Sequence, residues 1–260
     1  GLEPVYEAEH RKHREPNRLF DGRGIGHQIG AFQDKRADLG MLLKDSIAWL
    51  KVPAKPHLAE GWIRNVFANG DARGGSHYMG VGDVDGDGFP EIAVGAKGAP
   101  FEDGNWFAFW KHPGAGSSDK PWQKQMLAID QVGATNVAGV DLNGDGRVDW
   151  AATRGHGRGV LWFENPTWKM RVIDPDLASP HSLAVGDFDD DGDMDLASCG
   201  FLSERVMWYQ NDGRGQFDLH VIDTQQESYD LRSVDMDGDG DLDLLNAGRA
   251  TQNVVWYENR

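Results

Sequence analysis

Four short acidic strings in this chain carry oxygen-bearing side chains at a fixed spacing that suits a loop wrapped around a metal ion. The strings are GDVDGDGFPEIAVG, VDLNGDGRVDWAAT, GDFDDDGDMDLASC and VDMDGDGDLDLLNA. Counted from the first aspartate, oxygen ligands recur at positions 1, 3, 5 and 9, and glycine occupies position 6. Glycine permits the positive φ of a tight loop, and flexible oxygen-rich loops suit Ca²⁺, with its about six to eight ligands, better than Mg²⁺.

These strings predict up to four metal loops, to which a backbone carbonyl near position 7 would add one more oxygen. The candidate ligands are Asp83, Asp85, Asp87, Glu91, Asp141, Asn143, Asp145, Asp149, Asp187, Asp189, Asp191, Asp195, Asp235, Asp237, Asp239 and Asp243. An EF-hand is excluded, because it needs a glutamate at position 12, where this chain has Val94, Ala152, Ser198 and Asn246. The alternative is a set of solvated acidic turns without metal, which four copies of one spacing disfavour.

The charge of the chain is concentrated in the same strings. The net charge of the 260 residues is -16, but eighteen acidic residues lie in the four strings, so the remainder sums to about +2. There is no extended basic stripe, so nucleic-acid binding is not expected. No apolar run approaches the ~20 residues of a membrane helix, so membrane insertion is not expected either. The single cysteine, Cys199, excludes an internal disulfide; we expect a buried core thiol, and a place at the site is the alternative.

A second marker repeats with the acidic strings. Tryptophans follow alternating, strand-like runs 46 to 61 residues apart, at Trp49, Trp110, Trp162, Trp208 and Trp256. Five markers against four acidic strings indicate five units, of which the first has lost its loop. Each unit has the pattern of four short strands; in the third they are NVAGV, VDWAAT, GVLWFE and WKMRVI. Regular spacing, glycine-rich turns and period-two alternation predict radially repeated antiparallel sheets, with the tryptophans packed between them.

The predicted fold is therefore all-β: one five-bladed β-propeller over residues 1–260. The blades are expected at about 20–70, 71–131, 132–175, 176–224 and 225–260, the last completed by residues 4–13. PVYEAEHRK at the start of the chain resembles the fourth-strand segment PTWKMRVID, and an N-terminal strand in the C-terminal blade would remove an open sheet edge.

The acidic strings resemble the FG-GAP (VCBS-type) repeats of integrin-like and bacterial β-propellers. The resemblance covers four of the five units, and it implies a propeller with Ca²⁺ held in these loops. Some propellers of similar repeat type act on sugars by elimination, including ulvan-type polysaccharide lyases and a fungal anhydrofructose dehydratase. Those proteins are larger and typically seven-bladed, and none of their catalytic motifs aligns with this chain.

The face opposite the metal loops gathers polar residues of another kind. In a propeller the innermost strand of each blade lines a central channel, so residues that begin it surround the channel mouth. These are His27, His77, Asn136, His181 and Tyr229, and the ends of the second strands add Lys97, Arg154, His156 and Arg249. Trp106 could offer a face to a sugar ring. Strand-end residues can also be inert caps, but such a set favours a ligand site.

One hypothesis is an enzyme that performs β-elimination on an anionic uronate or a keto sugar. His77, His181 or Tyr229 would remove the proton α to the carboxyl or carbonyl group. Arg154, Lys97 or Arg249 would hold the carboxylate and stabilise the enolate-like charge, while His27, Asn136, His156 and Trp106 contact substrate. In a variant of this hypothesis His27, His77 and His181 hold a transition metal at the mouth.

The alternative is a non-catalytic module that binds carbohydrate or protein, lectin- or adhesion-like, with structural calcium. Lectin propellers usually repeat their ligand residues in every blade, whereas the mouth residues here differ between blades, which favours the enzyme narrowly. The expected partner is a carbohydrate with acidic groups, and a protein partner belongs to the alternative. Four calcium loops predict a calcium-rich compartment, so the chain is expected to be secreted, periplasmic or at the cell surface.

Overall fold

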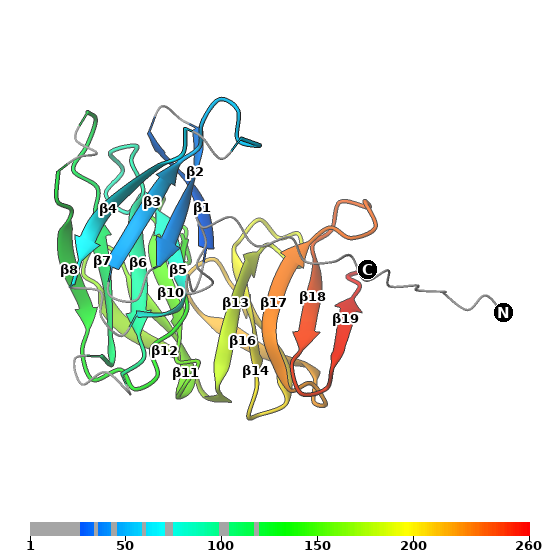
Figure 1. The fold of residues 1–260 in the computed structure, drawn as a ribbon. Coiled ribbons are helices and arrows are strands. Elements are labelled where there is room, and N and C mark those ends of the chain that lie inside the picture. The colour runs from blue at the N-terminus through cyan, green and yellow to red at the C-terminus, as the bar shows by residue number, and fades with distance from the viewer. Residues whose placement is uncertain are drawn as a thin grey trace.

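The computed structural model describes residues 27–33, 36–42, 46–58, 61–70, 75–98, 104–116 and 120–260, with side chains from residue 46 onward except at 75–77. Within these ranges the chain is all-β, and its strands form five antiparallel sheets, each built from strands consecutive in sequence (Figure 1). No helix in this part of the chain has the length and apolarity to cross a membrane.

The sheets have the following strands. The first contains β1 (His27–Gln33), β2 (Arg36–Leu42), β3 (Ser46–Lys51) and β4 (Ile63–Asn69). The second contains β5 (Gly75–Gly82), β6 (Glu91–Ala96), β7 (Trp106–Lys111) and β8 (Gln123–Ala128). The third contains β9 (Val137–Val140), β10 (Asp149–Thr153), β11 (Arg158–Glu164) and β12 (Lys169–Ala178). The fourth contains β13 (Pro180–Gly186), β14 (Asp195–Gly200), β15 (Arg205–Asn211) and β16 (Phe217–Asp223). The fifth contains β17 (Ser228–Val234), β18 (Asp243–Gly248) and β19 (Asn253–Tyr257).

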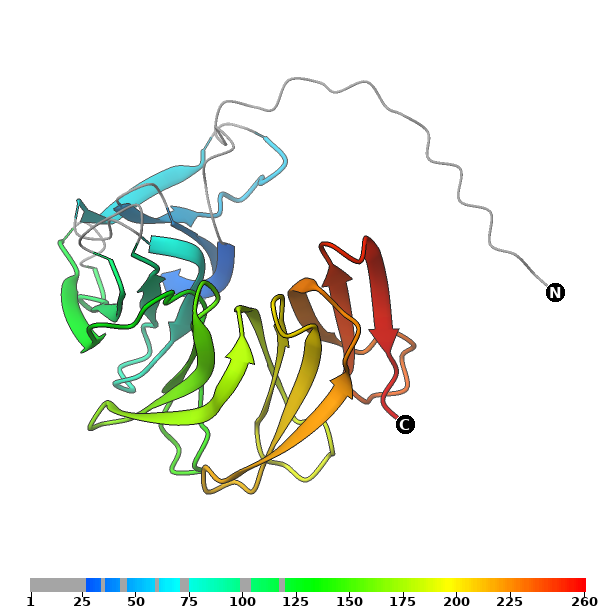
Figure 2. The ribbon, with the colours of Figure 1, turned by 90° about the horizontal axis from the view of Figure 1, so that it is seen from below.

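The five sheets follow one another in chain order along an arc, which Figure 2 shows from below. Neighbouring sheets meet through their first strands: β5 contacts β1 and β9, and β13 contacts β9 and β17. The four strands expected in the third unit correspond to β9–β12. Residues 4–13, the predicted closing strand, lie outside the described residues, so a closed five-bladed ring stays a prediction.

Four hydrophobic clusters fill the spaces between successive sheets. Side chains alternate between the two faces of a strand, so adjacent residues of one strand serve two interfaces. On β11, Phe163 packs toward the second sheet, with its ring 5.5 Å from that of Phe107. Its neighbour Trp162 packs toward the fourth sheet, in the cluster that contains Met207. The second, third and fourth sheets are therefore packed on both faces.

The register corrects one part of the tryptophan repeat. Trp162 pairs with Ala151, two residues after position 9 of its loop, and Trp208 and Trp256 have the same register. Trp110 pairs instead with Ile92, one residue after position 9, and Phe109 occupies the tryptophan place. The offset of one residue turns Trp110 to the opposite face, where it packs toward the first sheet together with Trp49.

The tryptophans of successive sheets differ in burial because their neighbours differ. Trp49, Trp110 and Trp162 are almost fully buried between sheets, as expected for packing residues. Trp256 lies on the outer face of the fifth sheet, against which no described sheet packs, and its side chain is 43% exposed. Cys199 is fully buried in the cluster between the fourth and fifth sheets, as expected for a core thiol.

Close approach of the second and third sheets requires glycine at Gly95. A Cβ atom there would lie 2.6 Å from the backbone nitrogen of Thr135 and 2.8 Å from the carbonyl carbon of Ala134. Both obstacles are backbone atoms, which cannot rotate away. Ala247 holds the equivalent place in the fifth sheet, four residues after position 9, and is exposed.

We predict that Gly95→Ala lowers the free energy of unfolding by about 1–3 kcal/mol, because overpacking displaces one sheet against the next. Chemical denaturation measures this, with Ala247→Gly as the matched control, for which we expect a change of about 1 kcal/mol or less. Equal stability of Gly95→Ala and the unchanged protein would show that the two sheets are not held at this contact.

Candidate functional site

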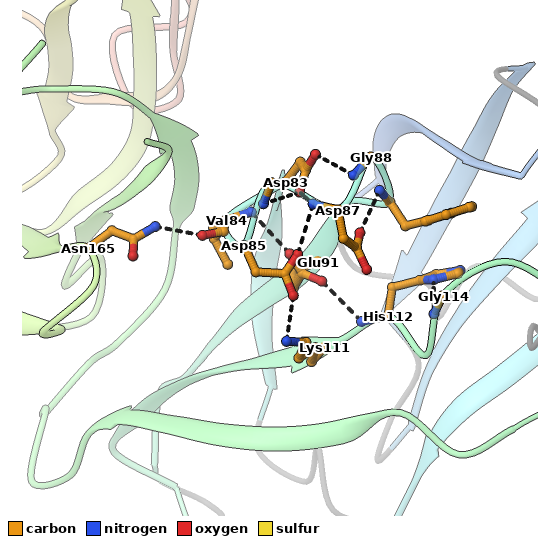
Figure 3. Close-up of polar contacts among 12 residues, drawn as sticks. Asp83, Val84, Asp85, Asp87, Gly88, Glu91, Lys111, His112, Gly114 and Asn165 are labelled. Atoms are coloured by element: carbon orange, nitrogen blue, oxygen red, sulfur yellow. Dashed lines mark hydrogen bonds and ion pairs between the residues drawn. The ribbon is translucent and has the colours of Figure 1, made fainter. Parts of the chain in front are cut away.

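Each acidic string forms the loop between the first and second strands of its sheet, and its backbone folds around the first aspartate. In the second sheet, Asp83 Oδ1 accepts a hydrogen bond from Gly86 N at 2.8 Å, and Oδ2 accepts one from Gly88 N at 2.9 Å (Figure 3). Asp141 and Asp235 accept hydrogen bonds from the same two loop positions, 4 and 6, and Asp187 accepts them from positions 5 and 6. The position-6 glycines all have positive φ, such as 86° at Gly88. The spacing of the aspartates and the position-6 glycine therefore folds each loop around the carboxylate oxygens of its first aspartate.

Three of the four loops bring carboxylates together closely enough to share a cation. The ligand atoms lie within 4.8 Å of one another in three groups: Asp83, Asp85 and Glu91; Asp187, Asp189 and Asp191; and Asp235, Asp237 and Asp239. The loop of the third sheet has the amide of Asn143 at position 3. Like charges this close disfavour one another's ionisation unless a cation lies between them. An all-oxygen donor set of this kind suits a hard divalent cation.

The acid at position 9 is placed differently from the other ligands. Glu91, Asp149, Asp195 and Asp243 are buried and begin the second strand of their sheets. In the fourth sheet, Asp195 Oδ2 accepts from Phe188 N of its own loop at 3.3 Å, and Oδ1 accepts from Asn211 N, at the end of the third strand, at 2.7 Å. The other three acids bridge the same two segments. Position 9 thus ties the loop to the sheet.

Burial makes the charge of Glu91, Asp149 and Asp195 costly, whereas backbone hydrogen bonds from Asn259 and Met236 lower the pKa of Asp243. Desolvation raises the pKa of Glu91 to about 7 and that of Asp149 to about 6, and hydrogen bonds from backbone N–H groups only partly offset it. In the fourth sheet the indole of Trp208 also donates to Asp195 Oδ2 at 3.0 Å. This tryptophan therefore supports the loop as well as the core, a role that its spacing alone did not indicate.

An asparagine in the third, fourth and fifth sheets fastens each sheet to the loop of the sheet before it. The Nδ2 group of Asn211 donates to the carbonyl of Leu142, at position 2 of the preceding loop, and to that of Met194, both at 2.9 Å. Asn165 and Asn259 repeat both contacts, to the loops of the second and fourth sheets. We refer to Asn165, Asn211 and Asn259 as the asparagine latches.

Sequence reasoning missed the latches, although their signal is present. Asparagine follows the tryptophan marker by three residues in WFEN, WYQN and WYEN. The second sheet has His112 at the corresponding place; its backbone N–H binds Glu91 at 3.1 Å, and its ring stacks on Phe89. The first sheet carries no acidic string. Asparagine thus occurs only in sheets that follow a loop-bearing sheet.

In the second sheet, a lysine side chain of the protein itself contacts the acidic loop. Lys111 Nζ forms an ion pair with Asp85 at position 3 (Figure 3), and this contact raises the pKa of Lys111. At the equivalent place in the fourth sheet, the neutral amide of Gln210 contacts Asp189. An ammonium group competes with a metal ion for the same carboxylate. The position-3 carboxylate is therefore less available to a metal ion in the second loop than in the fourth.

On the opposite face, part of the predicted mouth set comes together. The ring of His181 stacks on that of Tyr229 at 4.0 Å, and His156 lies edge-on to His181 at 4.8 Å. The guanidinium of Arg249 lies 4.9 Å from the ring centre of Tyr229 and 5.4 Å from that of Phe201. We call His156, His181, Phe201, Tyr229 and Arg249 the mouth cluster. Phe201 was not predicted; it follows the end of β14 directly.

Lys97 lies close enough to the mouth cluster for its charge to act on His156. Desolvation and the positive charge of Lys97 lower the pKa of His156. Burial raises the pKa of Tyr229, and the nearby Arg249 opposes this. His181 is 4% exposed, with its Nδ1 hydrogen-bonded to the carbonyl of Ser179 at 3.1 Å.

The other predicted mouth residues lie elsewhere or outside the description. Arg154 donates through Nε and Nη2 to Gln131 Oε1. Asn136 is buried, and the register places Thr135, one residue earlier, level with His181. Trp106 is 7% exposed and packs in the core toward the first sheet, with little of its ring left for a ligand. His27 and His77 lie in β1 and β5, and their side chains are outside the described residues, so the transition-metal variant stays a prediction.

We predict that Asn211→Ala lowers the free energy of unfolding by about 1–3 kcal/mol, because the carbonyls of Leu142 and Met194 lose a buried hydrogen-bond donor. Asn211→Asp should be at least as harmful, since a carboxylate cannot donate to a carbonyl. Equilibrium denaturation with metal present measures both, with exposed Asn253→Ala as control. If neither Asn211 variant is less stable than that control, the latch has no role in joining the sheets.

Comparisons with known proteins agree with these features. The FG-GAP-like repeat family matches residues 83–152 and 141–198. The chain is similar to the crystal structure of the V. cholerae biofilm matrix protein Bap1, with 15% identity and a TM-score of 0.50 over 93% of this chain. It spans 39% of the length of that structure, and the likeness concerns the fold alone. No curated protein matches the chain. The acidic loops and their spacing agree with the family match, so residues 83–198 of this chain carry FG-GAP-like repeats.

Proposed function

We propose that this chain is a non-catalytic, adhesion-type binding module: a calcium-stabilised five-bladed propeller that binds a carbohydrate with acidic groups at the mouth cluster. The observation that carries the proposal is the position of Arg249 over two aromatic rings. A guanidinium fixed in this way presents a planar fork of donors to a carboxylate or sulfate. Among the described residues no carboxylate pairs with it.

The surroundings of Arg249 fit the same ligand class. Tyr229 is half-buried, so part of its ring faces outward beside the cation. Lys97 and His156 add positive or titratable groups on the same face. The acidic loops lie at the other ends of the same strands, since β13 begins beside His181 and ends beside Asp187. An anionic ligand would therefore meet the basic face without repulsion from the loops.

The elimination hypothesis has less support from the described residues. A general base needs to reach the substrate proton directly or through one water. His181 is nearly inaccessible, with one ring nitrogen already bonded to Ser179. Burial raises the pKa of Tyr229, which weakens it as a base at neutral pH. Arg154 is held by Gln131. These placements suit recognition better than proton transfer.

Calcium is the ion that suits the loops best. All candidate ligands are oxygens, the loops are short and exposed, and the FG-GAP-like repeats cover three of them. With calcium in the loops, an extracytoplasmic location is the natural setting, and the similarity in fold to a biofilm matrix protein is in keeping with it.

The binding proposal predicts that Arg249→Ala weakens binding to polygalacturonate, a uronate polymer, by at least about tenfold, because a charge-assisted bidentate contact is lost. Retention on an immobilised polymer, with calcium present, measures this. Arg214→Ala, an exposed arginine in the turn between β15 and β16, is the control and should bind normally. Absorbance near 235 nm should stay flat; a steady rise would mean elimination and refute the non-catalytic proposal. Equal retention of Arg249→Ala and Arg214→Ala would refute the site.

The calcium proposal predicts that a chelator lowers the melting temperature strongly. A ligand that binds only the folded state stabilises it by about 2.7 kcal/mol per site at a hundredfold excess over its dissociation constant. Differential scanning calorimetry with and without calcium measures the shift. Asp187→Asn with Asp189→Asn should reduce the shift, because one loop loses two charged ligands. An unchanged melting curve, after metal analysis shows that the protein has been stripped, would contradict structural calcium.

A further inference from the structure

A groove of about 500 Å³ lies between the fourth and fifth sheets, on the face that carries the acidic loops. We call it the acidic groove. Its apolar lining includes Trp208, Ile222 and Tyr257, and its polar lining includes Asp190 and Asp241. An apolar floor below carboxylates is the complement of a side chain that has an aliphatic stem and a cationic head. The groove is distant from the mouth cluster, and its role is additional to the proposed function.

The repeat supplies an internal comparison. An equivalent groove of about 600 Å³ lies between the second and third sheets, with Phe109 at the place of Trp208. Position 4 of the loop is Gly86 there and Asp190 in the acidic groove, and position 7 is Arg147 there and Asp241 in the acidic groove. The two grooves thus have equivalent positions in the repeat, but Asp190 and Asp241 make one negative where Arg147 makes the other positive.

The charge of the acidic groove persists when the loops hold cations. Asp190 and Asp241 stand at positions 4 and 7, outside the ligand positions 1, 3, 5 and 9. Glu258 and Arg260 also line the groove, and they pair with each other at 2.8 Å. Asp190 and Asp241 are therefore the carboxylates left for a ligand.

The third sheet already shows a cation on the equivalent tryptophan. The guanidinium of Arg171 lies 4.9 Å from the ring centre of Trp162 and pairs with Glu164 at 2.7 Å. In the fourth sheet, the neighbour across the strands from Trp208 is His220, which stacks on the indole at 4.7 Å. In the fourth sheet His220 thus takes the place that Arg171 has in the third, so a cation in the groove meets only the part of the Trp208 ring that lines the groove.

From these observations we infer that the acidic groove receives an arginine or lysine side chain from a partner polypeptide. Trp208, Ile222 and Tyr257 contact the aliphatic stem, and Trp208 offers a ring to the cation. Asp190 and Asp241 accept hydrogen bonds from the charged head. The equivalent groove between the second and third sheets, with Lys111 and Arg147 at its rim, excludes the same side chain by repulsion.

The test is an NMR titration of the calcium-saturated chain with an acetylated, amidated glycine-serine peptide that contains one arginine. A matched peptide with glutamine in place of arginine is the ligand control. We expect the arginine peptide to shift the indole resonance of Trp208 and the glutamine peptide to bind at least tenfold more weakly. Asp190→Gly with Asp241→Arg, which copies Gly86 and Arg147, should weaken binding of the arginine peptide at least tenfold.

Two controls separate this inference from its alternatives. Asp190 has a φ of 61° and Gly86 one of 73°, so glycine fits the loop at Asp190; if the double variant does not fold, Asp241→Asn alone replaces it. Arg249→Ala should leave peptide binding unchanged, so failure of the mouth proposal does not affect this result. Equal affinity for both peptides, or equal binding by the groove variant, overturns the inference. Butylammonium binding as tightly as the peptide would overturn the polypeptide partner.

Discussion

The buried carboxylate at position 9 of each loop joins the elements on which the rest of the structure depends. It begins the second strand, accepts a hydrogen bond from its own loop, and accepts another from the end of the third strand. The charge of a buried carboxylate is stabilised only when its oxygens are satisfied, and two or more N–H donors do this while the ion-binding positions lie above it. The acidic loop is therefore part of the sheet rather than an appendage.

The asparagine latches extend this connection from one sheet to the next. A latch contacts the carbonyl at position 2 of the preceding loop, and the N–H of that same position-2 residue binds the position-9 carboxylate. Ordering of a loop by a cation thus reaches the packing of two sheets through a single residue such as Leu142. Through these contacts, ions bound at the exposed face would stabilise a core that consists largely of aromatic and aliphatic side chains between sheets.

Much of the fold followed from periodicity, because alternation of side chains and acidic spacing are local properties of the chain. The loops and the strands of the third sheet are examples. The register was less accessible: WFAFWKH and VLWFEN look alike in sequence, but one residue of offset turns Trp110 to the opposite face from Trp162. The latches were missed because a hydrogen bond from Asn211 to Leu142 joins residues in different sheets. The sequence predicted a ligand contact for Trp106, whose side chain is buried between sheets. This burial depends on packing between sheets, which no local sequence pattern specifies.

Function in such a repeat resides where the copies differ. The loops and latches are nearly uniform, so they serve stability in every sheet that has them. The charged residues around that frame are not uniform: Lys111 beside the second loop, Gln210 beside the fourth, and Asp241 where the third loop has Arg147. A substitution at these positions changes the local potential without disturbing the hydrogen bonds that hold the sheets. The same backbone can in this way carry a basic mouth, one groove with Lys111 and Arg147 at its rim and another with Asp190 and Asp241.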